Sequence, residues 1–86
     1  MIYLVVEQSF DPPLTDEAYL AMSQRIDPCL SAHQVQWRRS LVATDRRRMI
    51  CTFQAADAEA VRAAYRSAGE QFERVWTAET YEPAGP

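Results

Sequence analysis

Hydrophobic side chains recur at the spacing of a strand in some stretches of the chain and at the spacing of a helix in others. Residues 2–8 are rich in β-branched and aromatic side chains in both phases, which predicts a strand buried on both faces. Pro12 and Pro13 end this strand because proline cannot donate to a ladder. Thr15 is then a suitable N-cap, and apolar positions at helical spacing predict a first helix over about 15–27.

The middle of the chain predicts a broken helix followed by a hairpin. Asp27 can cap a new turn that begins at Pro28, so 28–33 is predicted as a short, kinked continuation of the first helix. Two further runs, 35–43 and 48–54, have the composition of strands, and the short turn between them predicts an antiparallel hairpin.

The last third of the chain predicts one helix and one strand. Asp57 caps a helix whose apolar residues follow the i, i+3, i+4, i+7 pattern up to Gly69, and 72–79 reads as a fourth strand. The resulting order, β-α-β-β-α-β, predicts a ferredoxin-like α+β fold. Both helices are expected on one face of a four-stranded antiparallel sheet with strand order 4-1-3-2. We expect a single domain over 1–81 and a flexible tail over 82–86.

The sheet face that the helices leave open predicts a partner. Leu4 and Val6 lie in one phase of the first strand. Tyr3 and Val5 make the other phase apolar as well, although a strand facing water should alternate with polar residues. An apolar sheet face is an unusually large patch for a monomer. We therefore expect a homodimer in which two sheets pack face to face. The sequence leaves open whether Trp37 packs under the helices or between the sheets.

Composition and charge exclude several partners. The 86 residues are 48% hydrophobic and 24% charged, as in an ordinary globular domain. A net charge of −3 argues against nucleic acid, whose binding proteins normally carry a basic face. No stretch approaches the roughly 20 apolar residues of a membrane span, and the first apolar run is too short for a secretion signal. Two cysteines are too few for a disulfide scaffold, so we expect reduced thiols and a cytoplasmic protein.

Three side chains are candidate metal ligands. His33 is the only histidine and follows Cys29 by four residues, so a helical turn would place both on one face. Thiolate and imidazole are donors that nickel, zinc and copper prefer. A tetrahedral structural site needs four ligands, and Cys51 would be a third if the fold or a second subunit brought it near. Taken singly, a lone histidine such as His33 is more often a surface residue than a ligand, and Cys51 in its apolar strand is more often a small buried hydrophobic residue.

The familiar catalytic motifs are missing from the sequence. It has no P-loop, nucleophile elbow or dinucleotide fingerprint, and two glycines are too few for a phosphate cradle. We assign no catalytic residue and expect no organic cofactor, which favours a binding protein over an enzyme. The alternative is a small-molecule binder or cofactor-free enzyme of the dimeric α+β-barrel type. Its pocket would be lined by Tyr3, Glu7, Trp37 and Tyr65, with His33 or Glu7 moving protons. A third possibility is an assembly or regulatory module with no site of its own.

Seven stretches, taken in order, resemble a known family: Tyr3-Leu4-Val5-Val6-Glu7, Cys29-Leu30, Val35-Gln36-Trp37-Arg38-Arg39-Ser40, Arg48-Met49-Ile50-Cys51-Thr52-Phe53, Ala56-Asp57-Ala58-Glu59-Ala60-Val61-Arg62, Ala68-Gly69 and Arg74-Val75-Trp76. Together they resemble the small bacterial family typified by a nickel-responsive, nickel-binding protein. The likeness runs from residue 2 to about 79, and 57–62 and the two cysteines are its most specific parts. It implies a dimer of ferredoxin-like subunits that binds nickel or a similar divalent transition metal. Gln34 and Arg46 stand where glycine would be expected.

Overall fold

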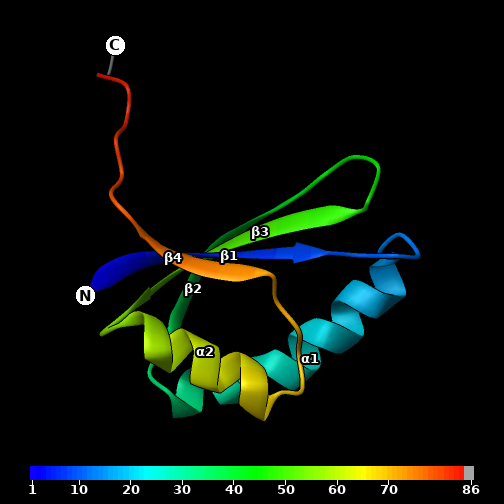
Figure 1. Ribbon diagram of the computed structural model, residues 1–86, viewed down its shortest axis with the longest axis horizontal. Helices are drawn as coiled ribbons and strands as arrows, with labels where there is room; N and C mark the ends of the chain where they lie inside the picture. The colour runs from blue at the N-terminus through cyan, green and yellow to red at the C-terminus, as the bar shows by residue number, and fades with distance from the viewer. Residues whose placement is uncertain (85–86) are drawn as a thin grey trace.

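The structure is a computed structural model and describes residues 1–84. It has two layers: one is a four-stranded antiparallel sheet, and the other consists of two helices that cover one face of the sheet (Figure 1). The elements are β1 (Ile2–Ser9), α1 (Asp16–Ala32), β2 (Gln36–Val42), β3 (Arg48–Ala55), α2 (Ala58–Ser67) and β4 (Arg74–Ala78). The strand order β2-β3-β1-β4 is the predicted order read from the other edge. The ferredoxin-like α+β fold is therefore confirmed. The predicted tail over 82–86 stays a prediction, and its last two residues lie outside the described part of the chain.

β1 lies inside the sheet and is buried on both faces, as its composition predicts. It pairs antiparallel with β3 on one side and with β4 on the other. Leu4 and Val6 point toward the helices and are fully buried, and Val5 on the opposite face is 6% exposed. The main core lies between the sheet and the helices. There the ring of Tyr65 makes edge-on contacts with Phe53 and Phe72, at centroid distances of 5.9 and 5.7 Å.

α1 is one continuous helix, which corrects the predicted break at residue 27. Thr15 caps it as expected, because its hydroxyl accepts a hydrogen bond from the Ala18 amide at 3.0 Å. Pro28, however, lies inside the helix, and Asp27 does not begin a new one. Proline forfeits one helical hydrogen bond. The residues after it still pack on the core, with Leu30 buried and Cys29 half-buried, and this packing offsets the lost bond.

Both helices end in the same hydrogen-bonded motif. In α2 the amides of Gly69 and Glu70 donate to the carbonyls of Arg66 and Tyr65, and Gly69 has a φ of +70°. This is the Schellman arrangement, which requires a left-handed residue just past the helix. The end of α1 repeats it with Gln34 in the left-handed position, at a φ of +56°. Glycine was expected at this position, and the left-handed φ of Gln34 explains why it would suit it.

A bulge in β2 decides which side chains face the helices. The register places Trp37 opposite Phe53 and Ser40 opposite Cys51, with an irregularity between Trp37 and Arg39. One extra residue in a strand reverses the phase that follows it. Trp37 and Ser40 consequently lie on the same, helix-covered face. The open question about Trp37 is thereby answered: it lies at the edge of the layer under α1, with 52% of its surface exposed.

Candidate functional site

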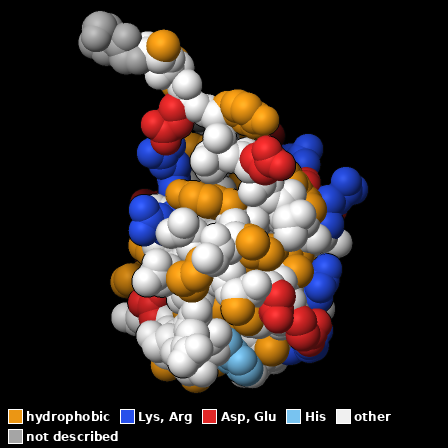
Figure 2. Space-filling view, turned by 90° about the vertical axis from the view of Figure 1, so that its left-hand side faces the viewer, with side chains coloured by type: hydrophobic (Ala, Val, Ile, Leu, Met, Phe, Trp, Pro, Cys, Tyr) orange, Lys and Arg blue, Asp and Glu red, His pale blue; other side chains and the backbone are white. Residues whose placement is uncertain are grey.

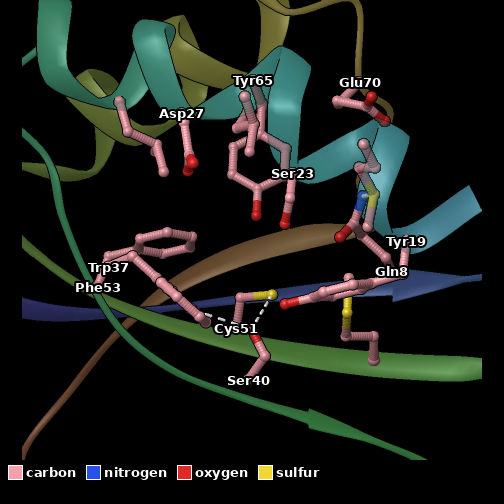
Figure 3. Close-up of a pocket in the computed structure, with 14 residues that line it drawn as sticks. Gln8, Tyr19, Ser23, Asp27, Trp37, Ser40, Cys51, Phe53, Tyr65 and Glu70 are labelled. Carbon is pink, nitrogen blue, oxygen red and sulfur yellow. Dashed lines mark hydrogen bonds between the residues drawn. The ribbon is translucent and has the colours of Figure 1, made fainter. Parts of the chain in front are cut away.

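A small cavity lies between α1 and the sheet, on the side of β2 and β3 (Figure 3). Its wall is largely apolar and includes Ile26 and Leu30 from the helix and Phe53 from the sheet. The space open to the centres of water-sized spheres is about 40 Å³. Since one water needs roughly 10–15 Å³ by this measure, the cavity has room for a few waters or one ion. Pockets for organic ligands are usually about 300–1,000 Å³, so its size counts against the small-molecule alternative.

Cys51 presents its thiol to this cavity from the middle of β3. The Ser40 hydroxyl donates a hydrogen bond to the Cys51 sulfur at 3.0 Å, and the Trp37 indole N–H donates to the Ser40 oxygen at 3.0 Å. Burial raises the pKa of the Cys51 thiol, and hydrogen bonds with Ser40 and Tyr65 lower it by less. At neutral pH the thiol is therefore protonated, which makes it a poor nucleophile.

Tyr65 places a second polar group in the same space from α2. Figure 3 shows its hydroxyl directed into the gap above Cys51, with Ser23 beside it. Burial, followed by the neighbouring Cys51, raises the pKa of the Tyr65 hydroxyl far above its ordinary value. The hydroxyl is thus neutral throughout the physiological range. Asp27 and Glu70 also line the cavity, and Glu70 is paired with Arg25 at 2.6 Å.

Cys29 and His33 lie together at the C-terminal end of α1. His33 is the C-cap, and its backbone amide donates to the Cys29 carbonyl at 3.1 Å. The His33 ring nitrogen Nε2 is 3.4 Å from the Ser67 hydroxyl of α2. The single histidine is visible at the molecular surface in Figure 2. The predicted turn that brings Cys29 and His33 into proximity is therefore present.

The three predicted metal ligands do not form one cluster within a single chain. Cys51 lines the cavity under α1, whereas neither Cys29 nor His33 does. Across residues 1–84 there is no group of three or more His, Cys, Asp or Glu side chains placed to hold a metal ion. Cys29 and His33 are one helical turn apart, joined by a backbone hydrogen bond, and Cys51 lies in a separate environment.

The four residues predicted to line one pocket are divided between the two faces of the sheet. Trp37 and Tyr65 line the cavity on the helix side. Tyr3 and Glu7 lie in the alternate phase of β1 and point to the other face. Glu7 accepts a hydrogen bond from the Trp76 indole at 2.7 Å there and lies 3.5 Å from the guanidinium of Arg48. These contacts explain the position of the Glu7 carboxylate without a ligand.

Sequence reasoning missed Ser40, the direct hydrogen-bond partner of Cys51. A regular strand would place Ser40 in the phase opposite to Trp37, and no residue in this stretch is a glycine or proline that would signal a bulge. The contribution of methionines to the cavity wall was missed as well. Met22 and Met49 fit the apolar pattern of a core, so the pattern carried no further signal.

The sequence pattern of the family described as "Nickel responsive protein SCO4226-like" matches residues 3–77. The chain belongs to this family. One solved structure with the same fold is that of SCO4226 from Streptomyces coelicolor A3(2), with a TM-score of 0.82 and 12% sequence identity. The match covers 93% of this chain and 99% of that one, and at such low identity it establishes the fold alone. No protein with a curated description matches the sequence.

The SCO4226-like family agrees with the resemblance found from the sequence. Its description supports a link to nickel at the level of the family. Over the described residues, this member has no helix long and apolar enough to cross a membrane.

Proposed function

We propose that this SCO4226-like protein binds nickel or a similar divalent ion and buffers or senses it. The observation that carries the proposal is the pair of Cys29 and His33, one helical turn apart at the end of α1, in a chain of a nickel-responsive family. Thiolate and imidazole are a suitable donor pair for such ions. Two protein donors leave coordination positions for water or another molecule. An open site of this kind suits an ion that exchanges rather than one that holds the fold together.

The test is calorimetric titration of the untagged protein with Ni²⁺. His33→Ala and Cys29→Ser are each expected to abolish the heat of binding, because each removes one of two protein donors. Cys51→Ser is the matched control, since it also removes a thiol but from a separate environment, and it is expected to bind Ni²⁺ as the wild type does. Unchanged Ni²⁺ binding by His33→Ala would contradict this assignment.

We also propose that two copies pair through the sheet face that no helix covers (Figure 1). We call this the open face. Its side chains include Tyr3, Val5, Glu7, Leu41, Ile50 and Trp76, and the polar Arg48, Thr52 and Arg74 lie on it as well. Its apolar members are cross-strand neighbours, since Leu41 pairs with Ile50 and Val5 with Trp76. Leu41 is 61% exposed and Trp76 is 44% exposed in the single chain. A two-fold dimer would bury this patch against the same patch of a second copy.

Sedimentation equilibrium at tens of micromolar tests the dimer. We expect a species of twice the 9.8 kDa chain mass for the wild type. Leu41→Glu should shift the protein to the monomer, because the Glu carboxylate on the open face would be desolvated in the dimer at a cost in free energy. Leu20→Glu is the control, since Leu20 is similarly exposed, at 58%, but lies on α1. A monomeric wild type, or equal effects of the two substitutions, would contradict the proposed interface.

A further inference from the structure

We propose that the C-terminal segment, residues 79–84, crosses to the second copy of the dimer and docks on its open face, where Glu79 and Glu82 pair with Arg48 and Arg74. This inference rests on the dimer proposed above and names the polar contacts that would hold it in register. Two observations carry it: a pair of arginines that the dimer would bury with too few acceptors, and an acidic segment that leaves the sheet on the same side.

Arg48 of β3 and Arg74 of β4 share a single carboxylate on the open face, that of Glu7. Their guanidinium nitrogens lie 3.5 and 3.9 Å from its oxygens, and the Trp76 indole donates to the same carboxylate at 2.7 Å. The side chains of Arg48 and Arg74 are 67% and 69% exposed. Since each guanidinium carries five N–H donors, most of the donors of both arginines are left to water.

Pairing of two open faces would remove this water. Facing sheets pack about 10 Å apart, so the guanidinium groups of Arg48 and Arg74 would be covered by the second copy. A charged group that loses its water is destabilising unless new partners replace the lost hydrogen bonds. Carboxylates are the best replacement, because they accept two parallel hydrogen bonds from one guanidinium. The second copy is therefore expected to supply carboxylates at this place.

Only two acidic residues of the described chain meet this need. Five others are held by a side chain of their own chain: Asp11, Asp16, Glu59, Glu70 and Glu73. Four lie in the helical layer or accept backbone hydrogen bonds at turns and caps: Glu17, Asp27, Asp45 and Asp57. Glu79 and Glu82 remain, both exposed, and Glu79 accepts a hydrogen bond only from Tyr81 of the same segment, at 3.3 Å.

The position of the C-terminal segment fits a two-fold dimer of one orientation. Figure 1 shows the segment rising from the end of β4 on the side of the sheet that faces away from the helices, with the β2–β3 hairpin at the opposite end of the sheet. In the register, Ala78 pairs with Tyr3 at the start of β1, and Arg48 pairs with Ser9 at its end. A two-fold axis across the strands brings each segment over the arginine end of the other copy. An axis along the strands would instead set arginines against arginines, which like-charge repulsion disfavours.

The segment is long enough for this contact. β4 and β3 flank β1, so they lie about 10 Å apart, and the facing sheets are also about 10 Å apart. The path from β4 of one copy to β3 of the other is therefore about 14 Å. Four extended residues, from Ala78 to Glu82, span about 13–14 Å. The side chains of Glu82 and Arg48 close the remaining gap.

The test compares the dissociation constant of the dimer, measured by sedimentation equilibrium, in wild type and in Glu79→Gln/Glu82→Gln. Both residues are exposed, so folding is unaffected. We expect a dimer weaker by roughly tenfold or more, because four partly exposed ion pairs are lost per dimer. The difference should shrink as NaCl is raised. The matched control, Glu17→Gln/Glu59→Gln, removes the same charge from exposed positions on the helices and should leave the constant unchanged. Equal constants for the two double variants would overturn the docking.

A mixing experiment tests whether the contact joins two copies. Glu79→Arg/Glu82→Arg and Arg48→Glu/Arg74→Glu should each dimerise poorly alone, because like charges then meet. Mixed in equal amounts they should form a heterodimer, seen by native mass spectrometry, in which both contacts join opposite charges. A segment that folds back on its own chain would gain nothing from mixing, so the absence of a heterodimer would overturn the proposal. Circular dichroism checks that Arg48→Glu/Arg74→Glu folds, and if it does not, the constants of the glutamine variants decide.

The docking and the dimer fail in distinguishable ways. A monomeric wild type would contradict the pairing of open faces, and the docking with it. A dimer that Leu41→Glu disrupts and Glu79→Gln/Glu82→Gln leaves intact would keep the open-face interface and overturn the docking alone.

Discussion

At the scale of single residues, the left-handed positions after the two helices form a natural comparison. Gly69 and Gln34 occupy the same place in the same motif, yet only glycine adopts a positive φ without a steric cost. The left-handed conformation costs an L-residue about 1–2 kcal/mol. The left-handed conformation of Gln34 therefore lowers the stability of the folded state at this position.

Gln34→Gly is expected to raise the free energy of unfolding by about 0.5–1 kcal/mol. Relief of the left-handed strain exceeds the extra entropy that glycine has in the unfolded chain, which is roughly 0.5–1 kcal/mol. Urea denaturation measures the change. The converse substitution, Gly69→Ala, is expected to lower the free energy of unfolding by about 1 kcal/mol. A Cβ at Gly69 would meet no heavy atom within 4 Å, so this loss would come from the backbone conformation alone. A destabilised Gln34→Gly protein would show that the Gln34 side chain makes a favourable contact.

The two thiols should differ in reactivity. Cys51 is buried and its thiol pKa is raised by that burial, whereas Cys29 is half-buried. In native protein at pH 8 we expect a thiol reagent such as dithionitrobenzoate to modify Cys29 quickly and Cys51 at the rate of local opening. In urea the two rates should converge. Cys51→Ser should remove the slow phase only, and a single fast phase of two thiols in native protein would contradict the burial of Cys51.

At the scale of elements, α1 is the helix whose continuity the sequence did not predict. Its first turn is capped by Thr15, and its last turn ends in the Schellman motif at Gln34, so both ends are well defined. Pro28 leaves the carbonyl of Gln24 without its helical partner. The helix persists because its far end packs against the core.

Pro28→Ala is expected to raise the free energy of unfolding by about 1–2 kcal/mol. Proline in a helix interior costs about 3 kcal/mol relative to alanine, and part of this is offset because proline also restricts the unfolded chain. Thermal and urea denaturation both report the gain. Gln24→Ala is the control in the same helix and should change stability by less than about 0.5 kcal/mol. An unchanged free energy of unfolding in Pro28→Ala would contradict this expectation, because it would mean that the restored helical hydrogen bond adds little stability.

At the scale of the whole molecule, stability should depend on two buried groups that ionise at high pH. Burial raises the pKa of both the Cys51 thiol and the Tyr65 hydroxyl in the folded protein. The unfolded chain therefore loses these protons first as pH rises. Their contribution to folding stability is fully present below the unfolded thiol pKa of about 8.5 and is lost as pH rises through the folded-state values.

We accordingly expect the free energy of unfolding, measured with a metal chelator present, to fall above about pH 8.5. The slope approaches about 1.4 kcal/mol per pH unit for each proton that only the folded state holds. Cys51→Ser should remove the first part of this decline, and Tyr65→Phe should remove the part above about pH 10. A decline of the same size in both variants would assign it to other groups.

The architecture followed from local signals in the sequence. Strand and helix periods, the caps at Thr15 and Asp57, and Gly69 after α2 predicted the element order and the sheet topology. These signals are local because the period and the ends of each element can be read from its own residues. The sheet topology then follows because few topologies connect elements in this order. Glycine was expected at Gln34, before the second strand, and the left-handed φ of +56° found there gives the physical reason.

The candidate site depended on contacts between distant parts of the chain. Whether Cys51 faces Cys29 and His33 or faces Met22 depends on which face of the sheet α1 covers and how it is rotated, and no local period encodes that. The bulge in β2 placed Ser40 opposite Cys51 through pairing with β3, where one extra residue reverses a phase that the isolated strand leaves ambiguous. The sequence thus specified which donor atoms the chain carries. Long-range packing decided which of these atoms line the same cavity, because side chains of different layers come close only when the helices pack on the sheet.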